Sequence, residues 1–316
     1  MSNYTQNTNF AAKDSLPTGN PEKTILGADI DGEFSEIATM SATKIDLPGS
    51  PSEGDVLTYT SGAWASSAPV STVPQGYRYG CELSNGTDAA HDIDITTGTL
   101  RDVDNDGAMI LTSALTKQID VNWTEGDDAG GFPSGLSLSA DTWYHVFVIG
   151  KADGTVDAGF DTSPFCSNLL SDASGYVYYR RVGSVLTDAT SNILGFFQYG
   201  DTFYWKSPIE DLDSQVITTT QSLITLSVPP QVNCAAMFTI RSNTQSRDVY
   251  LHPPDVDDEE ADTTAARFTI QTGTVEQVSN GPVMIVTDTS SRLAARADGN
   301  TTVDLMTFGW RDFLDN

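Results

Sequence analysis

The sequence predicts a mainly β protein, in which tandem antiparallel β-sandwich-like domains follow an extended N-terminal segment with one short helix. Two observations predict this class. From Gln75 onward, short runs of β-branched and aromatic residues alternate with turn clusters of Gly, Asp, Asn and Ser, which is typical of a sandwich or barrel. Before that point, convincing helical periodicity occurs in one stretch. The predicted parts are residues 1–45, 46–75, 76–210 and 211–316.

The N-terminal part begins with about 24 residues that read as extended, adaptable chain. Asn, Thr, Ser, Gly and Pro alternate there, and Pro17 and Pro21 bracket a turn-prone stretch. The helix is predicted from Asp29 to about Lys44, with Asp29 or Asp31 as its N-cap.

This predicted helix carries one apolar stripe. Ile30, Phe34 and Ile37 fall at i, i+4 and i+7, which places them on one helix face. A stripe this short does not fold alone, because a short helix depends on packing for its stability. We therefore expect the segment to order on another subunit or on copies of itself.

Residues 46–75 form a predicted linker rich in Pro, Ser and Gly. It holds one strand-turn-strand signal, in which Val56 to Thr60 is followed by Ser61-Gly62 and then by Ala63-Trp64. A lone hairpin is marginal in water, so we expect neighbouring copies in an oligomer to support it.

The domain at 76–210 contains seven predicted strands, separated by turns such as Asp104 to Gly107 and Tyr199 to Asp201. We expect Ser207-Pro208 to end this run, because proline removes a ladder donor. The strands are predicted at 77–83, 91–96, 108–111, 117–121, 142–151, 176–186 and 196–205.

The last domain, 211–316, contains seven more predicted strands. The tract from His252 to Thr264 is acidic and holds Pro253 and Pro254, which predicts an exposed loop. The strands are predicted at 216–228, 235–241, 247–251, 267–271, 282–287, 292–297 and 303–313.

Charge excludes one class of partner. The chain has 43 Asp and Glu against 16 Lys and Arg, a net charge of −27. Such a surface repels phosphate backbones, so we expect no nucleic-acid binding. We also expect no membrane insertion, since no run of 18 apolar residues and no signal-peptide pattern occurs.

Catalytic motifs are missing from the sequence, and we expect no enzymatic activity. There is no G-x-S-x-G elbow, H-E-x-x-H motif or P-loop. His145 lies in an aromatic strand, as a core histidine would, and His252 is expected in a loop. Acid pairs such as Asp92 and Asp94 suit a glycosidase, but in so acidic a chain pairs arise by chance. The three cysteines read as buried thiols.

One motif suits a cation. Asp102, Asp104 and Asp106 alternate ahead of Gly107, like the first half of a calcium loop. The twelfth position, where a glutamate would complete the site, is Ser113. Two interpretations stay open: a β-turn calcium site, with calcium as the one candidate cofactor, or a plain Asp/Asn/Gly turn.

The aromatic clusters and the one pair of neighbouring arginines suit either ligand binding or packing. Aromatic residues cluster at Trp143-Tyr144, Tyr176 to Tyr179 and Phe196 to Trp205, which suits either a glycan site or a sandwich core, the core being favoured. Arg180 and Arg181 are neighbours in a strand, so we expect one to be exposed and the other to pair internally with a carboxylate.

The opening residues resemble the N-terminal segment of bacteriophage tail-fibre and virion-appendage proteins. The resemblance covers about the first 45 residues, and its two runs are 3–17, with the letters NYTQNTNFAAKDSLP, and 27–38, with GADIDGEFSEIA. The hairpin in 54–64 is similar to modules of phage fibre shafts. Residues 85–206 resemble, more weakly, a β domain of fibre-like proteins. The last 106 residues carry no resemblance.

The resemblance implies a structural protein of a tailed-phage virion, made in the host cytoplasm and placed on the tail or neck. It implies a homotrimer that anchors through its N-terminus to other virion proteins and displays its β domains for host attachment. The implied virion-attachment residues are Asn9, Phe10, Lys13, Asp14, Leu16, Pro17, Ile30, Phe34 and Ile37. A dedicated adhesin for a host-surface glycan and a head-located or neck-located fibre are the alternatives. No receptor-binding residue is indicated.

Overall fold

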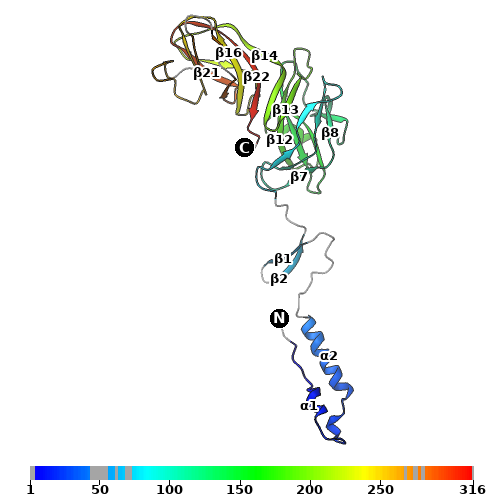
Figure 1. Ribbon diagram of the computed structural model, residues 1–316. Coiled ribbons are helices and arrows are strands. Elements are labelled where there is room, and N and C mark those ends of the chain that lie inside the picture. Colours follow the sequence, from blue (N-terminus) through cyan, green and yellow to red (C-terminus); the bar gives the residue numbers. More distant parts are fainter. Residues whose placement is uncertain are drawn as a thin grey trace. The chain divides into compact units, whose positions relative to one another are not determined.

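The computed structural model describes residues 4–42, 56–60, 63–67, 73–266, 269–272, 277–278 and 282–314. The chain divides into two compact units, Met1–Thr72 and Val73–Asn316 (Figure 1). The described strands far outweigh the helices, and they form several sheets. The predicted mainly β class is confirmed. None of the helices in these ranges has the length and apolarity to cross a membrane.

The first unit contains three short helical elements and one hairpin. The helical elements are α1 (Phe10–Asp14), the 3-10 helix η1 (Pro21–Lys23) and α2 (Gly27–Ala42). The prediction of plain extended chain over the first 24 residues was therefore wrong. Asparagine side chains start both new elements, because each accepts a hydrogen bond from a backbone N–H of the first turn. Asn9 Oδ1 accepts from Ala12 at 3.0 Å, and Asn20 Oδ1 accepts from Glu22 at 2.9 Å.

Helix α2 begins two residues earlier than predicted. The carbonyl of Leu26 accepts the first helical hydrogen bonds, from Asp29 N at 3.0 Å and Ile30 N at 3.4 Å. Asp29 is thus inside the helix, and its Oδ2 accepts the Leu26 backbone N–H at 2.9 Å. This reciprocal bond is one half of a capping box. Asp29 therefore caps the helix from its third position and is not the N-cap.

The predicted hairpin is present. Strand β1 (Val56–Thr60) pairs antiparallel with β2 (Ala63–Ser67), with Tyr59 opposite Trp64. The predicted Ser61-Gly62 turn and most of the predicted linker lie outside the described residues.

The second unit is built from short strands, which pair antiparallel apart from the parallel pair β8 and β9. Its one described helix is α3 (Ser167–Asp172). The strands are β3 (Arg78–Gly80), β4 (Leu83–Asn85), β5 (Asp92–Ile95), β6 (Gly98–Arg101), β7 (Ala108–Leu111), β8 (Leu115–Asn122), β9 (Ala129–Phe132), β10 (Trp143–Gly150), β11 (Val156–Asp161), β12 (Tyr178–Leu186), β13 (Phe196–Tyr199), β14 (Thr202–Ile217), β15 (Ser222–Thr225), β16 (Cys234–Ser242), β17 (Asp248–His252), β18 (Ile270–Gln271), β19 (Gln277–Val278), β20 (Val283–Val286), β21 (Arg292–Ala297) and β22 (Thr301–Asp312).

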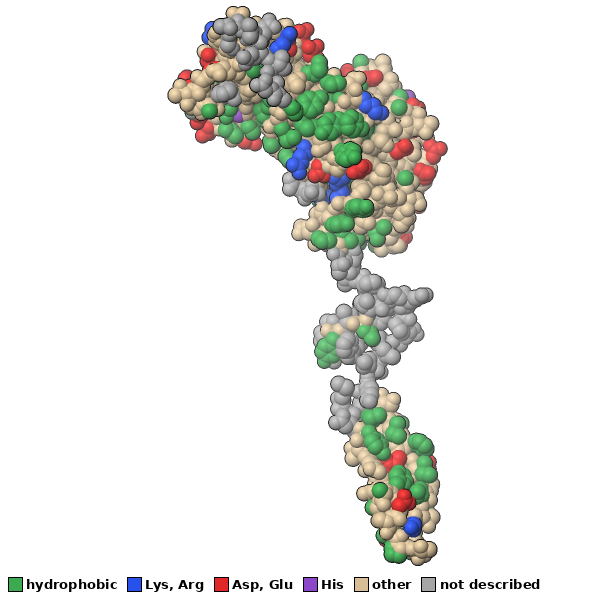
Figure 2. Space-filling model, in the orientation of Figure 1, with side chains coloured by type: hydrophobic (Ala, Val, Ile, Leu, Met, Phe, Trp, Pro, Cys, Tyr) green, Lys and Arg blue, Asp and Glu red, His purple; other side chains and the backbone are tan. Residues whose placement is uncertain are grey.

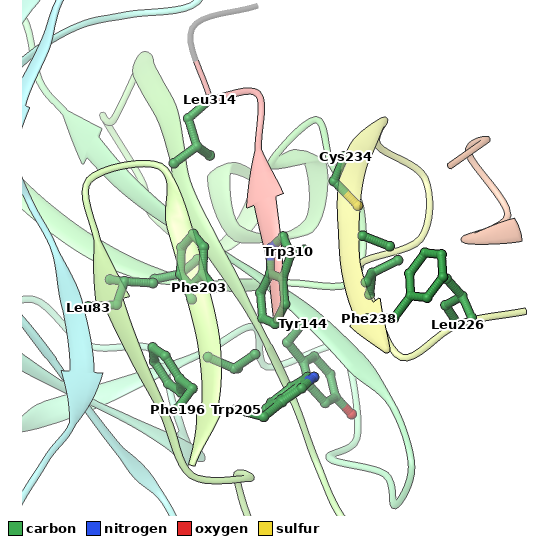
Figure 3. Close-up of a cluster of buried hydrophobic side chains, with 14 of the residues drawn as sticks. Leu83, Tyr144, Phe196, Phe203, Trp205, Leu226, Cys234, Phe238, Trp310 and Leu314 are labelled. Atoms are coloured by element: carbon green, nitrogen blue, oxygen red, sulfur yellow. The ribbon is translucent and has the colours of Figure 1, made fainter. Parts of the chain in front are cut away.

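A ten-stranded sheet runs through this unit in the order β19-β16-β22-β14-β13-β4-β5-β8-β9, with β20 also on β16. Two three-stranded sheets, β11-β10-β12 and β3-β6-β7, and a four-stranded sheet, β15-β21-β17-β18, complete the unit. The main apolar core draws side chains from both halves of the unit. Figure 3 shows its aromatic centre, where Phe203 stacks on Trp310 with ring centroids 4.9 Å apart.

The predicted boundary at Ser207-Pro208 lies inside a strand. Strand β14 continues through both residues to Ile217 and stays paired with β22. Proline is accommodated because the register shifts between Tyr204 and Ile209, so the missing N–H falls in an irregular stretch of the ladder. The two halves that were predicted as separate domains thus share one strand and one core.

Candidate functional site: the exposed face of helix α2

The candidate site is the face of α2 that the other described residues of its unit leave exposed. The chain at residues 4–8 covers a different face of α2, where it contacts the carboxylate of Glu33. Both the Tyr4 hydroxyl and the Thr8 backbone N–H donate to that carboxylate. Asn7 Nδ2 donates to the Gly32 carbonyl at 3.4 Å. We name this set of contacts the polar clasp.

An ion pair between Lys13 and Asp29 also belongs to the polar clasp, nearer the start of α2. Lys13 Nζ lies 2.8 Å from Asp29 Oδ2 and donates to the Thr24 carbonyl at 3.1 Å. Lys23 Nζ donates to the carbonyls of Asp14 and Leu16 at 3.1 and 3.0 Å. Charged side chains therefore hold α1, η1 and the start of α2 together, and no residue of α1 or η1 is buried.

The pKa values follow from these contacts. The Tyr4 hydroxyl and then the Thr8 N–H lower the pKa of Glu33 below its ordinary value, and the same bond raises the pKa of Tyr4. Lys13 and the Leu26 N–H lower the pKa of Asp29. Both carboxylates are therefore stabilised in their charged form, which keeps the polar clasp closed at neutral pH.

The apolar stripe faces solvent. The exposed fractions are 42% for Ile30, 65% for Phe34 and 44% for Ile37, and Leu26, one turn earlier, is 58% exposed. These residues lie next to the clasped positions Asp29 and Glu33 around the helix, so the polar clasp leaves them free. Exposed apolar side chains in a row are typical of a surface that binds a partner.

The other predicted attachment residues have mixed surroundings. Lys13 belongs to the polar clasp, and Asn9 caps α1. Phe10 and Leu16 are half-buried, whereas Asp14 and Pro17 are exposed. An open groove of about 600 Å³ lies beside them, lined by Ala12, Lys13, Leu16, Pro21, Glu22, Thr24 and Leu26.

Comparison with known proteins gives remote likeness among solved structures alone. No protein-family model matches the sequence. No curated protein matches it either. Among solved structures, the chain is similar to one in the structure of infectious bursal disease virus, Gx strain, at 12% identity over 78% of this chain and 74% of that one. The TM-score is 0.20, so this likeness carries no argument about function.

The predicted calcium loop is organised as a turn. Asp102 is 3% exposed, and its Oδ1 accepts the Gly107 backbone N–H at 2.6 Å. Asp104 and Asp106 are exposed. Within the described ranges, no three or more His, Cys, Asp or Glu side chains are arranged to hold a metal ion. Of the two interpretations, this geometry is that of the Asp/Asn/Gly turn, because the turn uses Asp102 for its own backbone.

A buried serine and histidine lie together in the second unit. His145 Nδ1 is 2.9 Å from Ser184 Oγ, and Arg181 Nη1 donates to the same oxygen at 3.1 Å. Both His145 and Ser184 are buried. Burial and then the nearby Arg181 charge lower the pKa of His145 to about 3. The prediction of a core histidine is therefore confirmed.

The arginine pair differs from its prediction. Arg181 pairs internally with Asp312, as expected for one member. Arg180, however, is only 5% exposed, and its Nη2 donates to the Leu314 carbonyl at 2.5 Å. His252 also differs: it ends strand β17 and is buried, where a loop was predicted.

The aromatic clusters are mostly core. Tyr144, Tyr176, Phe196, Phe203 and Trp205 are buried. Other members face outward, including Phe197 at 47% and Tyr199 at 80% exposure. Trp143 is half-buried and lines a hollow of about 530 Å³ together with Asp141, Asp188 and Asp211.

Sequence reasoning missed the residues that fix the site. Glu33 is the buried carboxylate that anchors the polar clasp, and Tyr4 is its hydroxyl partner. They are 29 positions apart, so no local spacing connects them. The sequence held one signal of this role, because Glu33 places a charged residue directly beside the apolar stripe of Ile30 and Phe34.

Proposed function

We propose that this chain is a non-enzymatic structural protein of a tailed-phage virion, a tail fibre or fibre-like appendage. Residues 1–45 anchor it to tail or neck proteins, and Val73–Asn316 forms the displayed β unit for host attachment. Homotrimeric assembly on the virion belongs to the same proposal. Both the virion anchor and the trimer are implied by the resemblance of the first 45 residues.

The observation that carries the proposal is the exposure of Phe34. A large apolar side chain at 65% exposure is costly in water, and burying it against a partner gains roughly 1.5–3 kcal/mol. The polar clasp fixes the neighbouring helix face. Phe34 and Ile37 are therefore already ordered before binding, which reduces the conformational entropy lost when a partner binds. An anchor segment has this combination of a fixed polar side and an open apolar side.

The test is assembly onto virions. Full-length chain is added to particles that lack it, and occupancy is measured by quantitative mass spectrometry and by microscopy. We expect the double variant Phe34→Ser, Ile37→Ser to reduce occupancy at least tenfold. Ile110→Ser is the matched control, since Ile110 is 55% exposed on strand β7 of the second unit. Full occupancy by the double variant would reject the anchor.

A second candidate function is favoured by the hollow beside Trp143. An indole ring next to carboxylates suits a neutral sugar, which stacks on the ring and donates hydroxyl protons to the acids. We propose as the alternative that the chain is an adhesin for a host-surface glycan. Fragment 211–316 is no fair probe, because the cut falls inside β14.

The alternative is therefore tested with the whole chain. Wild type and Trp143→Ala are compared for adsorption to host cells and to extracted envelope glycan. Loss of adsorption in the variant supports the adhesin, provided that its melting temperature stays near that of wild type. Equal adsorption by both chains removes the hollow as the site.

A further inference from the structure

An apolar row crosses the outward face of the ten-stranded sheet. The strand register aligns, from β20 to β13, the residues Met284, Met237, Gly309, Tyr204 and Phe197. Residues in register on neighbouring strands share a face. The residues that alternate with them, such as Phe203, Phe238 and Trp310, are buried in the core. The row therefore lies on the opposite side of the sheet from these residues, with Met284 and Phe197 exposed, Tyr204 half-buried, and Met237 and Gly309 buried.

A second row runs parallel to the first. It aligns Val286, Ala235, Arg311, Thr202 and Tyr199. We name the two rows together the sheet face. Its exposed members include Met284 at 54%, Phe197 at 47% and Tyr199 at 80%, whereas Met237 and Ala235 on β16 are only 5% and 4% exposed. Figure 2 shows hydrophobic side chains gathered over this part of the second unit, with charged side chains beside them.

The sheet face is preformed. Phe197 and Tyr204 stack with ring centroids 4.9 Å apart and an interplanar angle of 14°. Gly309 lets β14, β22 and the Met237 side chain pack closely, since an added Cβ would lie 2.1 Å from the Phe203 carbonyl oxygen and 3.1 Å from Met237 Cε. The end of the Met237 side chain therefore lies beside Gly309 in the row. A rigid, uneven apolar surface of this kind is suited to a protein partner.

Charge indicates which partner fits. The chain carries −27 overall, yet Lys206 and Arg311 are both exposed at the sheet face. The nearby Asp201 is already paired, with Arg78 at 2.5 Å and Arg311 at 3.9 Å. At the far rim Asp304 is paired with Arg241 at 2.5 Å, and Glu210 is exposed. The side nearest Tyr204 is therefore cationic.

A cationic rim does not pair with itself across a twofold axis, because Lys206 and Arg311 would meet like charges. The complement is an acidic surface with an apolar residue at its centre. The chain has such a surface: residues 255–260 are all exposed and hold five acids around Val256, which is 46% exposed. Two of these acids, Asp258 and Glu260, contact Arg296, which holds the segment in place.

We propose that the sheet face binds residues 255–260 of a second copy of this chain, in a head-to-tail contact. Val256 enters the apolar rows beside Phe197 and Tyr204, and its flanking acids meet Lys206 and Arg311. A contact between two different surfaces forms rings when the rotation closes. The contact is independent of the N-terminal anchor, since it involves the second unit alone.

The test is a charge swap in the full chain, with self-association measured by sedimentation equilibrium. We expect Lys206→Glu with Arg311→Glu to weaken association at least tenfold. Adding Asp255→Lys and Asp257→Lys to that variant restores association to within threefold of wild type. Association of wild type also weakens as salt rises from 50 to 500 mM.

Hydrophobic contact is tested by a matched pair. Phe197→Ser weakens association at least tenfold, whereas Tyr79→Ser, at a residue 71% exposed outside the sheet face, leaves it unchanged. A monomeric wild type overturns the proposal, as does a charge swap that fails to restore association. Association that responds to Phe34→Ser and not to Phe197→Ser also overturns it. Occupancy on virions is a separate measurement, so failure here leaves the anchor standing.

Discussion

The guanidinium group of Arg181 on β12 donates two hydrogen bonds to the carboxylate of Asp312 on β22, at 2.8 and 2.5 Å. The two residues are 131 positions apart, and the Asp312 side chain is fully buried. The pair joins a three-stranded sheet of the first half to the C-terminal strand of the ten-stranded sheet. Together with the shared strand β14, it makes the second unit one folded body.

Breaking this pair is expected to destabilise the whole second unit. Arg181→Met leaves a buried carboxylate without its partner, and we expect a loss of about 3–5 kcal/mol in the free energy of unfolding. The double variant Arg181→Met, Asp312→Leu removes both charges and should recover most of the loss. Urea unfolding monitored by tryptophan fluorescence measures both. A single variant as stable as wild type would contradict the importance of the pair.

His145 should make the protein sensitive to acid. Its folded pKa of about 3 lies below the unfolded value of 6.5, so the unfolded state binds a proton first. The stabilisation is complete above pH 6.5 and falls as pH drops toward 3, by roughly 2 kcal/mol at pH 5. His145→Asn should flatten that part of the stability curve, measured by urea unfolding at pH 7 and pH 5. An NMR signal of His145 that titrates near 6.5 would refute the mechanism.

The polar clasp should open in acid. The folded pKa of Glu33 is lowered, so its stabilisation is present above the ordinary value of 4.5 and is lost as pH falls through the folded pKa. Glu33→Gln should increase hydrogen exchange of the Thr8 amide at neutral pH, as acid does in wild type. Glu22→Gln is the control, because Glu22 makes no contact with Thr8. If neither Glu33→Gln nor acid alters hydrogen exchange at Thr8, Glu33 does not hold residues 4–8 against the helix.

The turn at Asp102 should behave as a turn and not as a calcium site. Asp102→Ala removes the acceptor of a buried N–H and should cost about 1–3 kcal/mol of stability. Asp104→Ala, at an exposed position, should stay within about 0.5 kcal/mol of wild type. Calorimetry with calcium should detect no heat that depends on either residue. A calcium-dependent rise in melting temperature that Asp102→Ala abolishes would restore the calcium interpretation.

Gly309 should tolerate no side chain. A Cβ there would lie 2.1 Å from the Phe203 carbonyl oxygen and 3.0 Å from the Tyr204 Cα, both backbone atoms of the paired strand. Gly309→Ala must part β14 from β22, at an expected cost of about 3 kcal/mol or more. Gly135→Ala is the control, since nothing lies within 4 Å of its Cβ position. Thermal unfolding of the two variants gives the comparison.

Alternation of apolar and polar residues predicted much of this fold. Strands β7 and β21 have the predicted bounds, and most others differ by one to three residues at their ends. Strands β6, β9 and β11 were missed because Gly98, Gly130-Gly131 and Gly159 weaken their β signal. The predicted end of the strand run at Pro208 was wrong, because the register shift between Tyr204 and Ile209 accommodates the proline within β14.

The candidate site was predicted only in part. Periodicity placed Ile30, Phe34 and Ile37 on one face, and the structure shows them exposed there. The contacts between Tyr4 and Glu33 and between Arg181 and Asp312 depend on how distant segments meet, which no spacing in the sequence encodes. The sheet face was missed for the same reason, since its rows are assembled across five strands.

The shared strand β14 also limits where evolution or an engineer can recombine this gene. A crossover near residue 210 would give each product half of one strand and an unmatched half of one core. A crossover close to Val73 keeps each compact unit whole. Chimeras that exchange the distal part should therefore be joined there, and natural mosaics of such chains should show their joints at the same place.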